Sequence, residues 1–249
     1  ASYEINHSGY TYVGWQWQAG QGTTSTNTNG SVTSTVSVNP TAGFSVVTYT
    51  GTGVSNATIG HGLGVAPSMI ILKSRTTNST SNNWWVYHSG LTSANNLYLN
   101  TTDAQFAISS TTSGGVGSVS STIFTAVNGV TNNNNTNQTS GNYVAYCWTP
   151  IAGFSSFGSY TGNGSADGPF IYTGFRPRWV MIKRTDTGGT SWVVLDTARS
   201  PYNYEAAILL PNLSDAEDSS SNRINGLSNG FKVIQPSAGV INLSGGTYI

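Results

Sequence analysis

Three blocks of this sequence occur twice, with the second copy about 110 residues after the first. Ordered blocks at a nearly constant offset predict two copies of one structural unit, each near the usual size of an independent domain. We expect a first unit at residues 42–151 and a second at 152–249. The repeated blocks are Ala42–Ser45 with Ala152–Ser155, Tyr49–Gly53 with Tyr160–Gly164, and Pro67–Lys73 with Pro177–Lys183.

Charged residues make up only 7% of the chain, and nine acids balance nine bases. Nucleic-acid binding needs a surplus of Lys and Arg, so nucleic acid is not expected as a partner. No apolar run approaches the length of a membrane span, and insertion into a membrane is likewise not expected. Cys147 is the single cysteine, which excludes a disulfide within the chain, and its apolar surroundings predict a buried thiol.

Strand signals dominate the sequence. Short runs rich in Val, Ile, Thr, Tyr and Trp alternate with Gly, Asn and Ser turns, which is typical of sandwiches and barrels. The pattern predicts two tandem antiparallel β-sandwich modules of jelly-roll size. The predicted strands are 43–50, 68–73, 83–88, 96–100, 122–127 and 142–149 in the first unit, and 154–160, 178–184, 191–196, 206–210, 230–234 and 246–249 in the second.

Alternation along the strands predicts which side chains are buried. Trp84 and Val86 share one strand face and correspond to Trp192 and Val194 in the second copy, so we expect these four residues in the cores. The runs 69–72 and 179–182 are apolar at every position, which predicts strands covered on both faces.

The two ends of the sequence carry parts of the same unit. The segment Tyr12–Trp17 resembles Tyr143–Trp148, the last predicted strand of the first unit, and Gly246–Ile249 matches the start of that strand. We therefore expect residues 1–41 to hold the closing strand of a preceding unit plus a linker. The favoured interpretation is an excerpt from a longer array. In the alternative, residues 10–17 close the final unit of the same or a neighbouring chain.

No catalytic or metal motif stands out, and we predict neither catalytic residues nor a cofactor. The three histidines are isolated in sequence, while Glu4, Asp186, Asp196 and Glu205 remain possible members of a glycosidase-type carboxylate pair. The turn Asn163–Gly168 offers oxygen ligands, but its single carboxylate favours an Asx-stabilised turn over a calcium site.

Sugar recognition combines aromatic ring faces with polar hydrogen-bonding side chains. On this basis we select Trp85, Tyr87, Tyr202 and Arg176 as candidate ligand-binding residues. The competing interpretation places most aromatic rings in the core, and gives the basic residues near 176–184 a role in solubility and in protecting a strand edge.

Four motifs are distinctive: Gly-Phe-Ser followed by Tyr-Thr-Gly-x-Gly, Gly60–Pro67, Tyr143–Trp148 and Gly174–Arg184. Together they resemble a tandem domain of bacteriophage tail-fibre and other virion appendage proteins, frequent in marine phages. The resemblance spans roughly residue 10 to the end of the sequence. It implies an all-β structural protein on the virion surface, with other virion proteins, copies of itself and a host-surface glycan or protein as partners. A glycan-degrading appendage enzyme and a purely architectural head-decoration protein are the alternatives.

Overall fold

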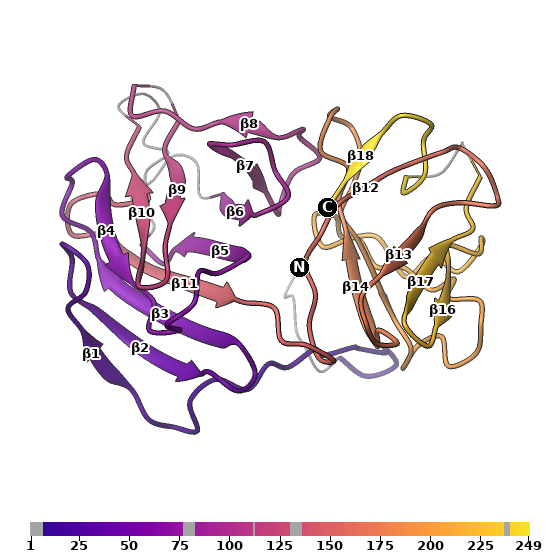
Figure 1. Cartoon of the computed structure of the whole chain (residues 1–249), viewed down its shortest axis with the longest axis horizontal. Helices are drawn as coiled ribbons and strands as arrows, with labels where there is room; N and C mark the ends of the chain where they lie inside the picture. The colour runs from indigo at the N-terminus through magenta and orange to yellow at the C-terminus, as the bar shows by residue number, and fades with distance from the viewer. Residues whose placement is uncertain (1–6, 77–82, 112, 130–135, 237–239) are drawn as a thin grey trace.

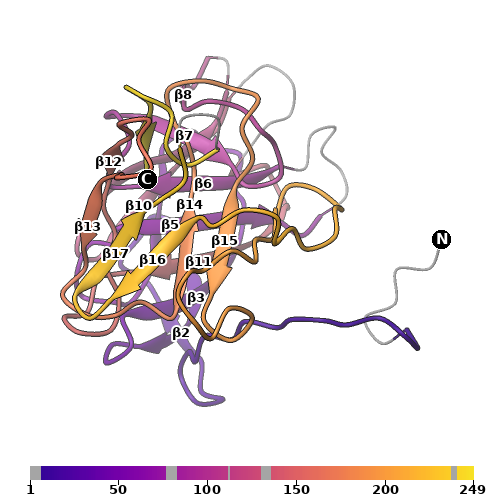
Figure 2. The same cartoon turned by 90° about the vertical axis from the view of Figure 1, so that its right-hand side faces the viewer.

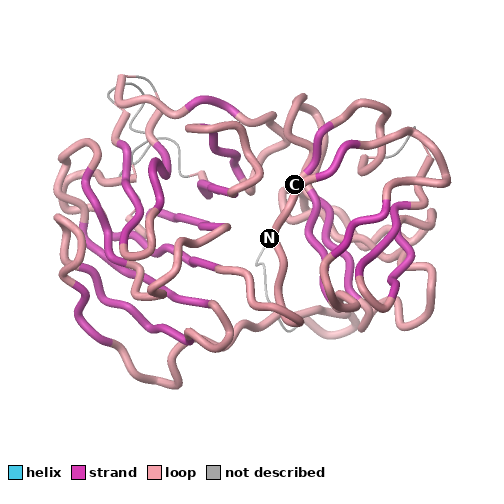
Figure 3. The backbone as a smooth tube through the Cα atoms, in the orientation of Figure 1, coloured by secondary structure: helices cyan, strands magenta, loops and turns pink. Residues whose placement is uncertain are grey.

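The computed structural model describes residues 7–76, 83–111, 113–129, 136–236 and 240–249. These residues form eighteen strands and no helix, so the expectation of an all-β, antiparallel sandwich fold is confirmed (Figure 3). No described helix is long and apolar enough to cross a membrane. The strands are β1 Ser25–Asn27, β2 Ser34–Asn39, β3 Phe44–Thr50, β4 Ala57–Gly60, β5 Met69–Ser74, β6 Trp84–His88, β7 Asn95–Tyr98, β8 Phe106–Ala107, β9 Gly115–Val119, β10 Ile123–Val127, β11 Asn142–Trp148, β12 Tyr160–Thr161, β13 Phe170–Tyr172, β14 Trp179–Ile182, β15 Val193–Asp196, β16 Ile224–Leu227, β17 Gly230–Val233 and β18 Thr247–Tyr248.

The chain folds into two halves that lie side by side, residues 20–151 and 152–249 (Figure 1). In the first half an eight-stranded sheet, ordered β1-β2-β3-β11-β5-β6-β7-β8, packs on a three-stranded sheet, ordered β4-β10-β9. The apolar core lies between these sheets and includes Val47, Leu72 and Cys147 from the large sheet and Ile59 and Phe124 from the small one. Burial of Cys147 raises its pKa well above the ordinary value, which leaves the thiol protonated and unreactive.

Strand β11 occupies the centre of the large sheet, between β3 and β5. Its last residue, Trp148, lies opposite Phe44 on one side and Met69 on the other, while Tyr143 lies opposite Tyr49. The side chains of Tyr143, Ala145 and Cys147 therefore enter the core as a period of two requires, and the alternate side chains face outward.

The second half has a related strand order. Its small sheet, β13-β17-β16, has the order of β4-β10-β9 in the first half. Strand β18 pairs with β12 on one edge, and a bridge between Tyr248 and Arg184 joins its other edge to the chain just after β14. Strand β18 thus lies between β12 and β14 in the way that β11 lies between β3 and β5.

Side-chain contacts also recur between the halves. The rings of Tyr49 and Tyr143 stack at 5.0 Å, and those of Tyr160 and Tyr248 stack at 4.9 Å. Tyr143 of β11 accepts a hydrogen bond from the backbone N–H of Gln138, five residues earlier. Tyr248 of β18 accepts one from the backbone N–H of Leu243, also five residues earlier. A stacked tyrosine pair with the same kind of backbone hydrogen bond therefore occurs in each half.

A third apolar group, the junction cluster, lies between the halves. Its buried members are Ile71, Val86 and Leu97 of the large sheet and Trp192 of the second half. The Trp192 indole N–H also donates a 2.9 Å hydrogen bond to the carbonyl oxygen of Tyr98. The second half therefore covers part of the outer face of the large sheet. Half-buried members of the cluster are Met69, Trp84, Leu91, Leu99, Tyr146, Trp148, Met181 and Ile249.

The junction corrects the predicted faces of β6. Trp84 was expected in a core, but it lies half-buried in the junction cluster, whereas Trp85 is buried in the first core. Trp192 and Val86 are buried as expected, yet both belong to the junction cluster. Both faces of β6 are apolar because both are covered, so alternation alone could not tell the inner face from the outer one.

Two predicted strands of the second half are largely absent. In the predicted segment 154–160 only Tyr160 is paired as part of a strand, and residues 206–210 form isolated bridges through Ile208 and Leu209. Residues 21–39, which fall in the segment expected to hold a linker, contain β1 and β2, and β2 pairs with β3 over six residues. The residues before them form an extended N-terminal arm (residues 7–19) that projects from the body (Figure 2).

Candidate functional site

Two of the four predicted ligand-binding residues lie in one region of the second half. Arg176 precedes β14, where the buried Pro177 leads the chain into the strand. Tyr202 belongs to the loop that follows β15, and its side chain is 83% exposed. Tyr204 in the same loop is 53% exposed, so two aromatic side chains of this loop are open to solvent.

The two segments meet at Gly226 in β16. A methyl group in place of one Gly226 hydrogen would lie 2.8 Å from Oε1 of Glu205, 3.6 Å from Nε of Arg176 and 3.6 Å from Oδ1 of Asn203. The Asn203 amide also donates a 3.1 Å hydrogen bond to the Gly226 carbonyl oxygen. The absence of a side chain at Gly226 leaves the space in which these polar groups gather. We call Arg176, Tyr202, Asn203, Tyr204 and Glu205 the loop site.

Glu205 is the most perturbed group of the loop site. Its side chain is only 1% exposed, and Oε1 has no hydrogen-bond partner within the protein. Burial raises the pKa of Glu205 to about 7, with Arg176 opposing the shift and Asp196 adding to it. A buried carboxyl whose Oε1 has no partner is an unsatisfied polar group of the kind found in binding and catalytic sites.

Asp196 lies close enough to influence Glu205, but its oxygens are occupied. It accepts hydrogen bonds from the Arg199 side chain and from the indole N–H of Trp15, together with backbone N–H groups. Burial works against ionisation of Asp196, yet these bonds outweigh it and lower the pKa of the carboxyl. Asp196 therefore ties the loop after β15 and the N-terminal arm to the second half.

The other candidate carboxylates, and the turn Asn163–Gly168 that was weighed as a calcium site, have separate partners. Asp186 pairs with Arg184, and Glu4 lies outside the described residues. In the turn after β12, Asn163 bonds the backbone of Ser165 and Asp167, and the Asp167 carboxylate pairs with Lys232. These contacts are those of an Asx-stabilised turn.

Trp85 and Tyr87 do not join the loop site. Trp85 is only 3% exposed, and its ring packs against those of Tyr98 and Phe106 in the first half. Tyr87 is half-buried against the same core. The expectation that these two rings are available for a ligand is therefore wrong for Trp85, because its faces are covered by protein.

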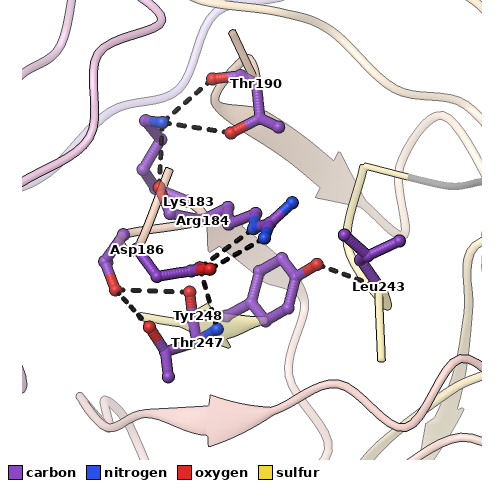
Figure 4. Close-up of polar contacts among 8 residues, drawn as sticks. Lys183, Arg184, Asp186, Thr190, Leu243, Thr247 and Tyr248 are labelled. Carbon is purple, nitrogen blue, oxygen red and sulfur yellow. Dashed lines mark hydrogen bonds and ion pairs between the residues drawn. The ribbon is translucent and has the colours of Figure 1, made fainter. Parts of the chain in front are cut away.

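Arg176 and Arg178 are exposed, as a role in solubility requires, but Lys183 and Arg184 are not. Lys183 is fully buried, and its ammonium group donates to the carbonyl oxygens of Arg184 and Thr190. This burial lowers the pKa of Lys183 to about 8. Arg184 forms two hydrogen bonds with Asp186, which in turn accepts from the backbone N–H of Thr247 (Figure 4). These residues hold β18 in place.

Glu205, Asn203 and Tyr204 were not selected from sequence as ligand-binding residues. The signal for them is the run Pro201–Glu205, in which aromatic and amide side chains alternate in a loop directly after a strand. The free carboxyl oxygen of Glu205 depends on the contact with Gly226, which lies more than twenty residues away in the sequence.

The fold and the loop site define an all-β protein with an exposed aromatic and polar surface. The family model described as "Domain of unknown function (DUF7483)" matches residues 1–249, and the chain belongs to this family. Neither the curated proteins nor the solved structures contain a match to the chain.

Proposed function

We propose that this chain is a structural and adhesive module of a bacteriophage fibre or virion appendage, and that it binds a host-surface glycan through the loop site. The observation that carries the binding role is a loop with two exposed rings, Tyr202 and Tyr204. Between and after them in sequence come Asn203 and Glu205, whose polar atoms gather with Nε of Arg176 around Gly226. Rings bind the CH-rich faces of sugars, while a carboxyl, an amide and a guanidinium bind sugar hydroxyls.

A modular array is supported by the contacts that recur in the two halves. The repeated sheet order and the two stacked tyrosine pairs, at 5.0 and 4.9 Å, are what two copies of one ancestral unit would retain. Several such modules on one particle would strengthen a weak contact with a glycan through a high effective concentration. A surface with few charges would keep that contact insensitive to salt.

Binding is tested with an array of neutral and acidic oligosaccharides, followed by calorimetric titration of the best-bound one. Tyr202→Ala should weaken binding by about tenfold, the effect of losing one ring contact. Adding Arg176→Ala to Tyr202→Ala should weaken glycan binding further. Tyr10→Ala is the matched control, since Tyr10 is comparably exposed but lies on the N-terminal arm. Equal binding by the wild type and the Tyr202 variant would refute the loop site, and no binding at all would favour the head-decoration alternative.

The alternative of a glycan-degrading enzyme has one observation in its favour. Glu205 has a pKa near neutrality and is influenced by the ionised Asp196, a combination that glycosidases use. Against it, the Asp196 oxygens are engaged by Arg199 and Trp15. Release of reducing ends from host polysaccharide by the wild type, lost in Glu205→Gln, would establish the enzyme and overturn the adhesive proposal.

A further inference from the structure

The outer face of the large sheet in the first half carries a polar pocket at one end of β11. At the other end of β11, Tyr146 and Trp148 belong to the junction cluster, which the second half covers. The pocket has a volume of about 220 Å³ and lies over β2, β3, the start of β11 and the end of β5. We call it the threonine pocket, and the side chains that project into it are those of Thr33, Thr35, Thr48, Thr50, Arg75 and Asn142.

Strand register explains why these side chains lie together. Thr35 lies opposite Thr48, and Thr50 lies opposite Asn142. The backbone N–H of Arg75 donates a 2.7 Å hydrogen bond to the Asn142 carbonyl oxygen, which extends the second row onto the chain after β5. Side chains two residues apart in a strand share one face, so the two rows project outward as neighbours.

The polar groups of the threonine pocket include donors without partners. Five ion pairs join described residues, and none of them involves Arg75. The Asn142 side-chain oxygen accepts a 3.2 Å hydrogen bond from the Thr50 hydroxyl, which leaves the two amide N–H donors free. No acidic side chain is among the described residues that line the pocket. The pocket therefore combines an uncompensated positive charge with free donors.

The equivalent place in the second half is closed by its own side chains. The repeated blocks pair Arg75 with Thr185 and Asn142 with Thr247. The backbone contact is the same, since the Thr185 N–H donates a 2.8 Å hydrogen bond to the Thr247 carbonyl oxygen. The two threonine hydroxyls are 2.9 Å apart and bond each other. One backbone arrangement thus carries a neutral, satisfied pair in the second half and a free guanidinium and amide in the first.

Charge is also balanced differently in the two halves. The backbone N–H of Asn142 donates to the hydroxyl of Thr76, whereas that of Thr247 donates to the carboxylate of Asp186. Asp186 also pairs with Arg184, as Figure 4 shows. The acid that neutralises an arginine in the second half is therefore a threonine in the first half, and no carboxylate takes its place in the pocket.

The threonine pocket has the chemistry of a site for a small oxyanion on a polar ligand. A guanidinium binds carboxylate, sulfate or phosphate oxygens through two parallel hydrogen bonds. Amide and hydroxyl groups bind the hydroxyls of a sugar. Pockets for drug-sized ligands begin at about 300 Å³, so a pocket of about 220 Å³ suits a single sugar residue rather than an oligosaccharide.

We propose that the threonine pocket binds an acidic sugar residue. Arg75 holds its carboxylate or sulfate oxygens, and Asn142 and the threonines hold its hydroxyls. This pocket lies in the first half and the loop site in the second, so the proposal does not rest on glycan binding at the loop site. Because Arg75 is exposed, salt screens this charged contact and weakens it.

Nuclear magnetic resonance titration of the ¹⁵N-labelled protein tests the ligand class. Sodium glucuronate or glucose 6-sulfate should shift the backbone amide resonances of Thr50, Arg75 and Asn142, and the lower dissociation constant of the two identifies the anionic group. Neutral glucose should not shift them. Sodium sulfate should bind more weakly than the acidic sugars, because it lacks the sugar hydroxyls. Sulfate binding as tightly as both sugars would overturn the assignment to a sugar.

Substitutions at Arg75 test the site itself. Arg75→Gln should weaken binding of the better acidic sugar by about tenfold or more, since a charge-assisted contact is lost. Arg75→Lys keeps the charge without the planar fork and should restore binding in part. Arg178→Gln is the matched control, because Arg178 is also exposed but lies in the second half. Unchanged binding in Arg75→Gln would overturn the proposal.

Two further variants separate this pocket from the loop site. Thr35→Val keeps the shape of a strand residue and removes one hydroxyl, so it should weaken binding of the acidic sugar about 2- to 10-fold and leave sulfate binding unchanged. Tyr202→Ala should not affect the titration. Loss of acidic-sugar binding in Tyr202→Ala but not in Arg75→Gln would place that ligand at the loop site and overturn the proposal.

Discussion

At the scale of single residues, the folded protein disfavours ionisation of the Glu205 carboxyl group. Its side chain is buried, one oxygen has no partner, and its pKa is raised to about 7 from an ordinary value of 4.5. Such a group costs stability whenever it is charged. A residue that weakens the fold in this way is a feature of binding and catalytic sites, which supports the assignment of the loop site.

The pH dependence of folding should reveal this cost. Below pH 4.5 the folded and unfolded carboxyls are both protonated, so Glu205 adds no pH dependence. Between pH 4.5 and about 7 only the unfolded carboxyl ionises, so stability falls as pH rises, by about 3 kcal/mol in all. Above pH 7 the loss is complete.

Glu205→Gln removes this titration. In urea unfolding, the stability of the variant relative to the wild type should increase from pH 4.5 to pH 8 by about 3 kcal/mol. Any effect of the new amide itself is the same at both pH values and cancels in the comparison. A relative stability that does not change with pH would show that Glu205 ionises normally in the folded protein.

At the scale of elements, the sequence predicts strands well where both partners lie in the same half. Predicted strands 68–73, 122–127 and 142–149 match β5, β10 and β11 to within one residue at each end. In the segment 154–160 only Tyr160 belongs to a strand, paired with Tyr248 of the two-residue strand β18, although the segment repeats the sequence of β3. Strand formation depends on a partner as well as on propensity.

The site was less predictable than the strands. Tyr202 and Arg176 were identified from residue type alone, whereas the positions of Trp85 and Tyr87 depended on which face of β6 is covered by the first core. The role of Glu205 depends on its approach to Gly226, a contact between segments distant in sequence. Residue types indicate the chemistry of the site, but tertiary packing decides which residues reach it.

A buried asparagine precedes β11 in the first half and β18 in the second, and each one bonds the loop around it. Asn242 is fully buried and bonds the backbone of Asn163, Ser165 and Gln235. Asn137 bonds the turn at Thr52 and Val54 in the first half. Each amide satisfies several backbone groups that would otherwise be buried without partners.

Asn242→Ala and Asn137→Ala should each lower the free energy of unfolding by about 2–4 kcal/mol, since several hydrogen bonds are lost at once. Asn242→Asp retains the acceptor for Asn163 N–H but loses the amide protons and buries a carboxyl against two carbonyl oxygens, so it should destabilise the fold at least as much as alanine. Calorimetric melting measures all three. Wild-type stability in the alanine variants would show that water replaces the amide in these loops.

At the scale of the whole molecule, the two halves share a buried boundary. The junction cluster unites residues of β5, β6 and β7 with Trp192 of the second half. Backbone hydrogen bonds add to it, from Gln105 N–H to the Thr185 carbonyl and from Gly189 N–H to the Thr102 carbonyl. A boundary with apolar burial and backbone bonding couples the unfolding of two domains, whereas a polar one leaves them independent.

Wild-type protein should therefore melt in a single calorimetric transition, and Trp192→Ala should separate it into two. The substitution removes a fully buried indole and its 2.9 Å hydrogen bond to Tyr98, at a cost of about 3–5 kcal/mol that falls on the boundary between the halves. Trp17→Ala is the matched control, since Trp17 also contacts rings from both halves, Trp148 and Trp179, but remains 42% exposed. It should shift the transition slightly and leave it single. A single, fully cooperative transition in Trp192→Ala would mean that the backbone bonds between the halves suffice to couple them.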